Sequence, residues 1–201
     1  MLSTHGLSCV RGERQLFAGL DFTLESGQWL HVRGENGSGK TSLLRLLSGL
    51  AVPAAGEIRW CGELIRQMGA LYREKMLFLG HQGALKEDLS GLENLMFAAA
   101  LDSAVLSDTQ AIAALRRFGL GARAELPVRV LSAGQKRRVL LARLLTRNAK
   151  LWVLDEPFTA LDVKAVDMLS VLIGEHLAAG GMAVLTSHQA MPIPGGQVVQ
   201  L

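Results

Sequence analysis

Apolar runs and helix-spaced apolar positions alternate along most of this chain. Four short segments are mostly apolar, the pattern of strands buried on both faces of a sheet: 28–32, 76–79, 151–155 and 182–186. Residues 42–50 and 133–145 instead place apolar side chains at helical spacing. Strands that alternate with helices in this way predict an α/β fold with a mostly parallel central sheet.

The segments outside this alternation predict further structure. Residues 1–24 alternate apolar and polar side chains, which indicates two antiparallel strands around a turn at Gly12, and residues 56–60 indicate another short strand. Residues 83–130 combine helical spacing with intervening glycines, which is typical of an inserted helical lobe. The last seven residues, GGQVVQL, are expected to close a short hairpin. We therefore predict one domain over residues 1–201, with a helical subdomain at about 83–145.

Composition excludes several classes of protein. Hydrophobic residues make up 49% of the chain and charged residues 19%, which argues against disorder. The net charge of +3, with Lys and Arg dispersed, is too small to require a nucleic-acid partner. Cys9 and Cys61 lie far apart in the sequence, so we expect free buried thiols and neither a disulfide nor a zinc site.

The hydropathy of the chain bears on its relation to membranes. No apolar run reaches the roughly 18 residues of a membrane span. The first residues lack the basic-then-apolar layout of a signal peptide. Mean hydropathy is nevertheless positive, at +0.26. This value indicates apolar surface that is reserved for a partner, or a large core, which would give the same average.

A glycine-rich segment supplies the most specific chemical signal. Its residues have the spacing of a P-loop, which wraps nucleotide phosphates: Gly34, Glu35, Asn36, Gly37, Ser38, Gly39, Lys40 and Thr41. The glycines let backbone N–H groups converge on an anion, Lys40 can reach the β- and γ-phosphates, and the Thr41 hydroxyl can ligate Mg²⁺. A strand before the turn and a helix after it are the context that the motif needs. The segment therefore predicts nucleotide binding.

Two carboxylates follow the apolar run 151–154. Asp155 and Glu156 are expected at the carboxyl edge of the sheet, where open α/β sheets bind their ligands. There Asp155 would hold Mg²⁺, directly or through water, and Glu156 would polarise an attacking water. The alternative is a surface turn with two solvated acids, against which the preceding apolar residues argue.

The string LSAGQ, residues 131–135, opens the basic helix. Ser132 as N-cap and Gln135 three residues later predict a capping box, which is a sufficient structural reason for both residues. The same string matches the signature motif of the ATP-binding subunits of ABC transporters. With the P-loop and the two acids, it makes the chain resemble that family.

The remaining motifs of the family follow in the expected order over nearly the whole chain. Gln82 matches the Q-loop glutamine, Asp162 in the string ALD matches the D-loop, and His188 matches the switch histidine. Taken singly, His188 fits a surface histidine at a strand end and Gln82 a solvated loop residue. Their joint order with the other motifs favours the family resemblance, which implies a P-loop fold with N-terminal antiparallel strands and an inserted helical lobe.

The resemblance also implies an ATPase mechanism. ATP would bind residues 34–41, and Mg²⁺ would lie among Thr41, Gln82 and Asp155. Glu156 would act as general base, and His188 would contact the γ-phosphate. Both are thereby candidate catalytic residues.

A second copy of the chain is part of that mechanism. Ser132 and Gly134 would reach the γ-phosphate bound to the other copy, and Asp162 joins them among the nucleotide-binding residues. The resemblance therefore implies an ATP-dependent homodimer that opens after hydrolysis.

The sequence departs from the family pattern at the nucleotide base. Such subunits often carry an aromatic residue near the first turn that stacks on adenine. The matching residues 8–14 read SCVRGER and contain none. The Arg11 guanidinium could stack in its place.

Several strings resemble one branch of the family, the haem-exporter ATP-binding subunit of the cytochrome c maturation system. They are LFAGLDFTL, LGHQGALKEDLSGLENL, LSAGQKRRVLLARL, LDEPFTALDV and LTSHQ. This resemblance implies integral membrane permease subunits as partners and a peripheral position on the cytoplasmic face of the bacterial inner membrane. The work performed would be haem export or release of a haem-loaded chaperone. No motif for haem is visible and His81 fits an ordinary loop histidine, so we expect no direct haem binding.

Three alternatives remain open at this level. Export of another cargo, such as lipid, drug or peptide, uses the same kind of ATPase subunit. DNA-repair and ribosome-associated ATPases resemble longer chains with coiled-coil insertions or two ATPase domains, and neither feature occurs here. A nucleotide-gated module without hydrolysis is disfavoured, because Glu156 and His188 are both present.

Overall fold

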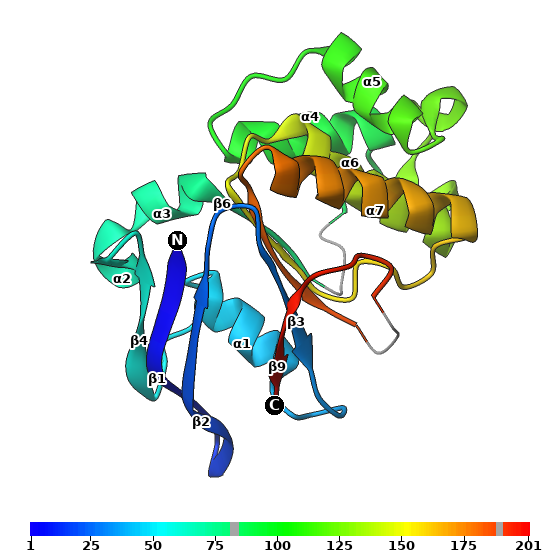
Figure 1. The fold of residues 1–201 in the computed structure, drawn as a ribbon. Coiled ribbons are helices and arrows are strands. Elements are labelled where there is room, and N and C mark those ends of the chain that lie inside the picture. Colours follow the sequence, from blue (N-terminus) through cyan, green and yellow to red (C-terminus); the bar gives the residue numbers. More distant parts are fainter. Residues whose placement is uncertain (81–84, 188–190) are drawn as a thin grey trace. The chain divides into compact units, whose positions relative to one another are not determined.

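The computed structural model describes residues 1–80, 85–187 and 191–201. Gln82 and His188 lie outside the described residues. Contacts divide the chain into two compact units, whose elements are labelled in Figure 1. The first unit comprises Met1–Gly80, Ala149–Pro157 and Leu172–Leu201, and the second comprises His81–Asn148 and Phe158–Val171.

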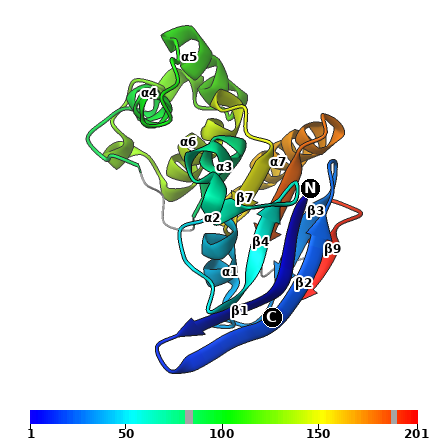
Figure 2. The same ribbon diagram turned by 90° about the vertical axis from the view of Figure 1, so that its left-hand side faces the viewer.

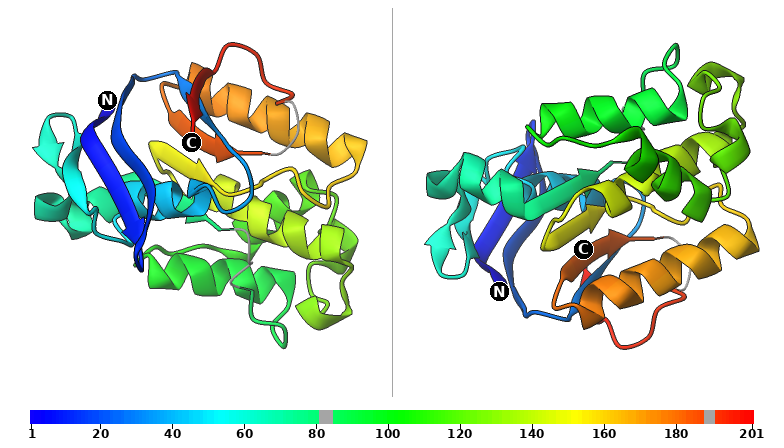
Figure 3. Two further views of the ribbon diagram at one scale, coloured as in Figure 1. Left: turned by 90° about the horizontal axis from the view of Figure 1, so that it is seen from below. Right: turned by 90° about the horizontal axis from the view of Figure 1, so that it is seen from above.

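An antiparallel sheet opens the first unit. It contains β1 (Leu2–Arg11), β2 (Arg14–Leu24), β4 (Ala55–Trp60) and β5 (Glu63–Leu64) in the order β2-β1-β4-β5. Figure 2 shows β1 between β2 and β4. The predicted hairpin is confirmed, and its two strands run side by side in dark blue in Figure 3.

The second sheet of this unit is parallel throughout. Its order is β6-β7-β8-β3-β9, formed by β6 (Met76–Leu79), β7 (Leu151–Leu154), β8 (Met182–Thr186), β3 (Trp29–Arg33) and β9 (Gln197–Gln200). The four apolar runs of the sequence form the inner strands β7, β8 and β3 and the edge strand β6. The expected C-terminal hairpin is wrong, because β9 pairs in parallel with β3 (Figure 1). A hairpin with β8 is impossible because β7 and β3 already occupy both edges of β8.

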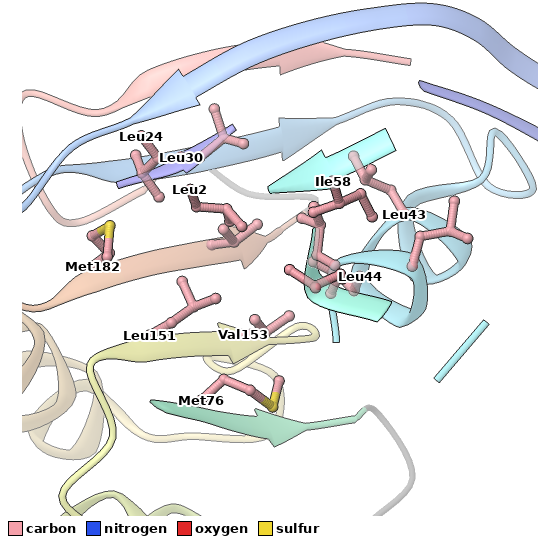
Figure 4. Close-up of a cluster of buried hydrophobic side chains, with 14 of the residues drawn as sticks. Leu2, Leu24, Leu30, Leu43, Leu44, Ile58, Met76, Leu151, Val153 and Met182 are labelled. Carbon is pink, nitrogen blue, oxygen red and sulfur yellow. The ribbon is translucent and has the colours of Figure 1, made fainter. Parts of the chain in front are cut away.

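A shared hydrophobic core joins the two sheets through α1 (Lys40–Leu47). Leu43 and Leu44 of this helix are fully buried beside Ile58 of one sheet and Val153 of the other (Figure 4). The helix begins two residues earlier and ends three residues earlier than predicted. This packing fixes the start of α1, and with it the glycine-rich turn, against the parallel strands.

The sequence reading missed two short helices of the first unit, α2 (Ile65–Met68) and α3 (Ala70–Lys75). Tyr72 of α3 is buried, and its hydroxyl donates a 2.6 Å hydrogen bond to the Leu47 carbonyl at the end of α1. Cys9 is buried as expected, whereas Cys61 is exposed in the turn between β4 and β5. Both thiols are free.

The second unit is helical, as the spacing between residues 83 and 130 predicted. Its helices are α4 (Gly91–Leu101), α5 (Asp108–Arg117) and α6 (Ala133–Thr146), with short 3₁₀ turns at Gly121–Arg123 and Val128–Val130 (Figure 1). Leu95, Leu115 and Phe118 lie in its core. The helix α7 (Val163–Ala178), which was not predicted, begins in this unit and continues into the first. Among the described residues, no helix combines the length and apolar character that a membrane crossing requires.

Candidate functional site

The glycine-rich turn lies between β3 and the start of α1. Gly34, Gly37 and Gly39 have φ of 152°, 81° and 111°, which is backbone that other residues rarely adopt. Gly39 is the N-cap of α1 and offers no side chain to the free N–H groups of the first turn, which also contains no acid. The turn therefore presents uncapped donors at a positive helix end, which suits the phosphates of a nucleotide.

Two side chains of the turn complete this anion site. Lys40 is only 8% exposed, and its Nζ donates to the carbonyls of Gly34 (2.7 Å) and Glu35 (2.9 Å), so the ammonium is held over the turn. The Ser38 hydroxyl is buried and has no hydrogen-bond partner within the described part of the chain. A buried polar atom left in this way is explained when a ligand supplies its partner.

A hydrogen-bonded group of oxygen atoms joins α1 to the ends of β7 and β8. Thr41 Oγ1 donates to Asp155 Oδ2 at 2.8 Å, and Thr186 Oγ1 donates to Asp155 Oδ1 at 2.7 Å. Asp155 is 2% exposed, so its carboxylate is not the solvated acid of a surface turn. Hydroxyl and carboxylate oxygens are ligands that Mg²⁺ prefers, and the donor set of Thr41 and Asp155 therefore fits that ion.

Glu156 follows Asp155 in an unusual backbone conformation. Its φ is 49°, in the left-handed region that non-glycine residues rarely adopt. The Glu156 N–H donates to Thr186 Oγ1 at 2.8 Å, which holds this conformation in place. Strained residues of this kind concentrate at functional sites. The Glu156 side chain is half-buried.

The sequence reading missed His31, a polar residue inside the apolar run of β3. His31 is 2% exposed; Arg33 Nε donates to its Nδ1 at 3.1 Å, and its Nε2 lies 3.4 Å from the Ser187 carbonyl. These partners require the neutral ring with the proton on Nε2. Burial lowers the pKa of His31, and the Arg33 charge lowers it further. The sequence contained one indication of this buried ring, namely a histidine within a run of apolar strand residues.

The LSAGQ string begins α6 in the second unit. Ser132 accepts from the Gln135 N–H at 3.3 Å, and Gln135 Oε1 accepts from the Ser132 N–H at 3.0 Å, so the predicted capping box is present. Ser132 itself is exposed. At Gly134, an added Cβ would lie 2.8 Å from the Ala160 carbonyl oxygen, a separation that real side chains do not show. Only glycine fits there.

Asp162 lies shortly after Ala160 in the sequence and directly precedes α7. Its Oδ1 accepts from the Ala165 N–H at 2.9 Å, and its Oδ2 forms an ion pair with Arg138 of α6. The Ala165 hydrogen bond, more than the Arg138 charge, lowers the pKa of this carboxyl. Asp162 therefore ties the segment before α7 to α6 within the second unit.

Comparison with known proteins identifies the family. Residues 17–159 match the family model described as ABC transporter. The chain is 55% identical, over 100% of its length and 98% of the relative's, to a cytochrome c biogenesis ATP-binding export protein, CcmA, of Dechloromonas aromatica. A protein of the same name from Shigella flexneri is 46% identical over 98% of this chain and 94% of its own.

Solved structures agree with this result. A putative ABC transporter ATP-binding protein from Pyrococcus furiosus has a TM-score of 0.86 at 27% identity and covers 100% of this chain and 96% of its own. A dimeric bacterial ABC transporter cassette has a TM-score of 0.87 at 22% identity, over 100% of this chain and 94% of its own, and supports the fold. This chain, with its P-loop, buried Asp155 and capped LSAGQ helix, belongs to the ABC transporter family of ATP-binding subunits, in the group of the cytochrome c biogenesis export proteins.

Proposed function

We propose that the chain is the ATP-hydrolysing subunit of a membrane ABC transporter complex that acts in cytochrome c biogenesis. The observation that carries the proposal is the 2.8 Å hydrogen bond between Thr41 and Asp155. It joins the phosphate-binding turn to the two acids at the end of β7, as hydrolysis of a nucleoside triphosphate requires. The names of the relatives support the cytochrome c branch.

The residues of the first unit divide the work of hydrolysis. The turn at residues 34–39 binds the phosphates through its N–H groups, and Lys40 leaves its two carbonyl partners to meet their negative charge. Thr41 and Asp155 hold Mg²⁺, and Gln82 joins them according to the family motif. When bound, Mg²⁺ neutralises charge that develops on the phosphate oxygens.

Glu156 acts as the general base. It directly follows the buried Asp155, and the hydrogen bond to Thr186 holds its left-handed backbone in place. A carboxylate that polarises water must reach the water while its neighbour holds the metal ion, and we assign these two tasks to Glu156 and Asp155. His188 contacts the γ-phosphate according to the family motif.

A second copy of the chain completes the site. Ser132, Gly134 and Asp162 take part in binding the nucleotide held by the partner copy, and ATP therefore promotes the dimer. Solved cassettes of the same fold are described as dimeric, one of them with ADP and phosphate bound. The exposed Ser132 at a helix N-terminus is suited to a phosphate, because its hydroxyl and the helix dipole act together. Loss of the γ-phosphate then weakens the dimer.

The energy of this cycle serves integral membrane permease subunits of the cytochrome c maturation complex. The chain would lie peripherally on the cytoplasmic face of the inner membrane, and the complex would export haem or release a haem-loaded chaperone. The chain itself binds neither haem nor nucleic acid in this proposal. The ATPase reaction is ATP plus water to ADP plus phosphate.

The substitution Glu156→Gln tests the base. We expect ATP turnover by the complete membrane complex to fall roughly 100- to 10,000-fold while ATP affinity is kept, since the amide cannot accept a proton. Glu13→Gln, in the exposed turn of the β1–β2 hairpin, is the control and should leave turnover unchanged. Undiminished turnover by Glu156→Gln would refute the proposed base.

The same variant tests the dimer. Because ATP is bound but not cleaved, Glu156→Gln should accumulate as a dimer in analytical ultracentrifugation with ATP, and wild type should dimerise less. A monomer at saturating ATP with the membrane partner present contradicts the shared site.

A further inference from the structure

The end of β8 is the place where this strand meets the two acids of the site. Thr186, its last residue, accepts from the Glu156 N–H at 2.8 Å and donates to Asp155 at 2.7 Å. Ser187 follows directly and is only 9% exposed. A group that fixes the backbone of Ser187 therefore also fixes Thr186, and with it the hydrogen bonds to both acids.

One face of β3 holds the chain that connects β8 to β9. β3 lies between these two strands in the parallel sheet, so the chain must cross β3 on its way from one to the other. Trp29 and His31 are two positions apart on β3 and therefore share a face, with ring centroids 6.2 Å apart. Trp29 Nε1 donates to the Pro194 carbonyl at 3.0 Å, and the same ring leaves no room for a side chain at Gly196. Trp29 thus anchors the end of this connection that leads into β9.

His31 anchors the end that leaves β8. Its Nε2 lies 3.4 Å from the Ser187 carbonyl, and its Nδ1 accepts from Arg33 Nε at 3.1 Å. A neutral ring with its proton on Nε2 satisfies both partners, whereas a ring with protons on both nitrogens has no acceptor for Arg33. Because the ring is buried, these two contacts set its orientation and its tautomer together.

We propose that His31 is a positioning residue for ATP hydrolysis, which holds Ser187 and, through Thr186, the two acids Asp155 and Glu156. The proposal rests on the proposed ATPase function. His31 acts through the backbone at the end of β8, so the role requires no contact between its ring and the nucleotide.

Protonation of His31 should disturb this arrangement. The charged groups that face its ring are Arg33, on the same strand, and Glu156, after β7. Burial lowers the pKa of His31 and the Arg33 charge lowers it further, while the Ser187 hydrogen bond and the Glu156 charge act in the opposite direction. The ring is therefore neutral near neutral pH, and the positioned state is lost only as pH falls below the ordinary histidine pKa of 6.5.

The test measures kcat and KM for ATP in the complete membrane complex between pH 5.5 and pH 7.5. His31→Leu removes both hydrogen bonds and should lower kcat roughly 5- to 20-fold with an unchanged KM. His31→Gln should restore kcat at pH 7.5, because its amide can donate to the Ser187 carbonyl and accept from Arg33. It should also lose less turnover than wild type at pH 5.5, since the amide does not titrate.

His176→Leu is the matched control. Its Nε2 also lies near a backbone carbonyl of β8, that of Met182 at 3.1 Å, but Met182 is the first residue of the strand, at the opposite end from the acids. Both leucine variants should unfold at a lower temperature than wild type, because each loses a hydrogen bond to the backbone. Only His31→Leu should also lose kcat.

Several results would overturn the role of His31. They are an undiminished kcat in His31→Leu, a raised KM as its only effect, or an equal loss of kcat in His176→Leu, which would show that turnover follows stability. Failure of His31→Gln to restore kcat, or a pH profile of His31→Gln identical to that of wild type, has the same consequence. If His31→Leu does not fold, the pH profile of His31→Gln decides alone. A wild-type complex that does not hydrolyse ATP instead refutes the proposed function itself, and so separates the two failures.

Discussion

In each of the two units, single residues hold conformations or positions that other side chains would disturb. Glu156 adopts a left-handed φ of 49°, a conformation that costs a non-glycine residue about 1–3 kcal/mol. The hydrogen bond from its N–H to Thr186 offsets part of this cost. At Gly134 the constraint is space and not backbone conformation, because the Ala160 carbonyl oxygen leaves no room for a Cβ.

The substitution Gly134→Ala tests the close approach. We expect the free energy of unfolding, measured by urea denaturation, to fall by roughly 1–3 kcal/mol because the added Cβ forces the two segments apart. Gly174→Ala is the matched control, since Gly174 also lies in a helix but has nothing within 4 Å of its Cβ position. There alanine should raise the free energy of unfolding by about 0.5–1 kcal/mol. Equal effects at the two sites contradict the crowding argument.

At the scale of the elements, three helices of the second unit begin in the same way. α4, α5 and α6 each have a serine N-cap and a reciprocal capping box, at Ser90, Ser107 and Ser132. The boxes of α5 and α6 are nearly identical, with glutamine as partner and a distance of 3.3 Å from its N–H to the serine hydroxyl. The hydrogen bonds at the LSAGQ helix start are therefore the same as those at the start of α5. A further role of Ser132 can be detected only in a functional assay.

The pair Ser132→Ala and Ser107→Ala separates capping from nucleotide binding. Each should lower the free energy of unfolding by about 1 kcal/mol, because each loses the same cap. Only Ser132→Ala should also reduce ATP turnover by the membrane complex, by roughly 10- to 100-fold, since it would lose the hydrogen bond that we propose to a charged phosphate. Turnover assays beside thermal unfolding check both statements, and equal turnover in the two variants removes the role proposed for Ser132.

At the scale of the whole molecule, two buried histidines connect stability to pH. Burial lowers the pKa of His31, which also faces Arg33 and Glu156, and of His176, which faces Lys150. His176 also stacks on Trp152 with ring centroids 3.8 Å apart, and its Nε2 lies 3.1 Å from the Met182 carbonyl. Both rings are neutral in the folded chain near neutral pH.

We expect the chain to lose stability as pH falls below the ordinary histidine pKa of 6.5. The unfolded chain takes up protons first, because its histidines have the higher pKa, and protonation therefore favours unfolding. The contribution of the two neutral rings to the free energy of unfolding is fully present above pH 6.5 and is lost as pH falls through the lowered pKa of the folded state. Urea denaturation at pH 7.5 and pH 5.5 measures the effect, and the double variant His31→Gln, His176→Gln should show a smaller difference. An unaltered pH dependence in that variant contradicts the assignment.

Features that depend on neighbouring residues could be predicted from the order of the amino acids. The P-loop, the β1–β2 hairpin, the parallel apolar strands and the α6 capping box follow from glycine conformations, side-chain periodicity and hydrogen bonds within a few residues, and the family followed from the order of such motifs. Gln82 and His188 were found in the same way and stay predictions, since they lie outside the described residues.

Contacts between residues that are distant in the sequence are visible only in the folded chain. Asp155 lies 114 positions from Thr41 and 31 from Thr186, yet the three share hydrogen bonds. Strand β9 took the free edge of β3, and β2 brought Phe17 against Gly39. Strand order and sheet packing set these contacts, because strands compete for sheet edges and apolar side chains compete for burial over the whole chain. The local periodicity of the sequence contains no information about that competition.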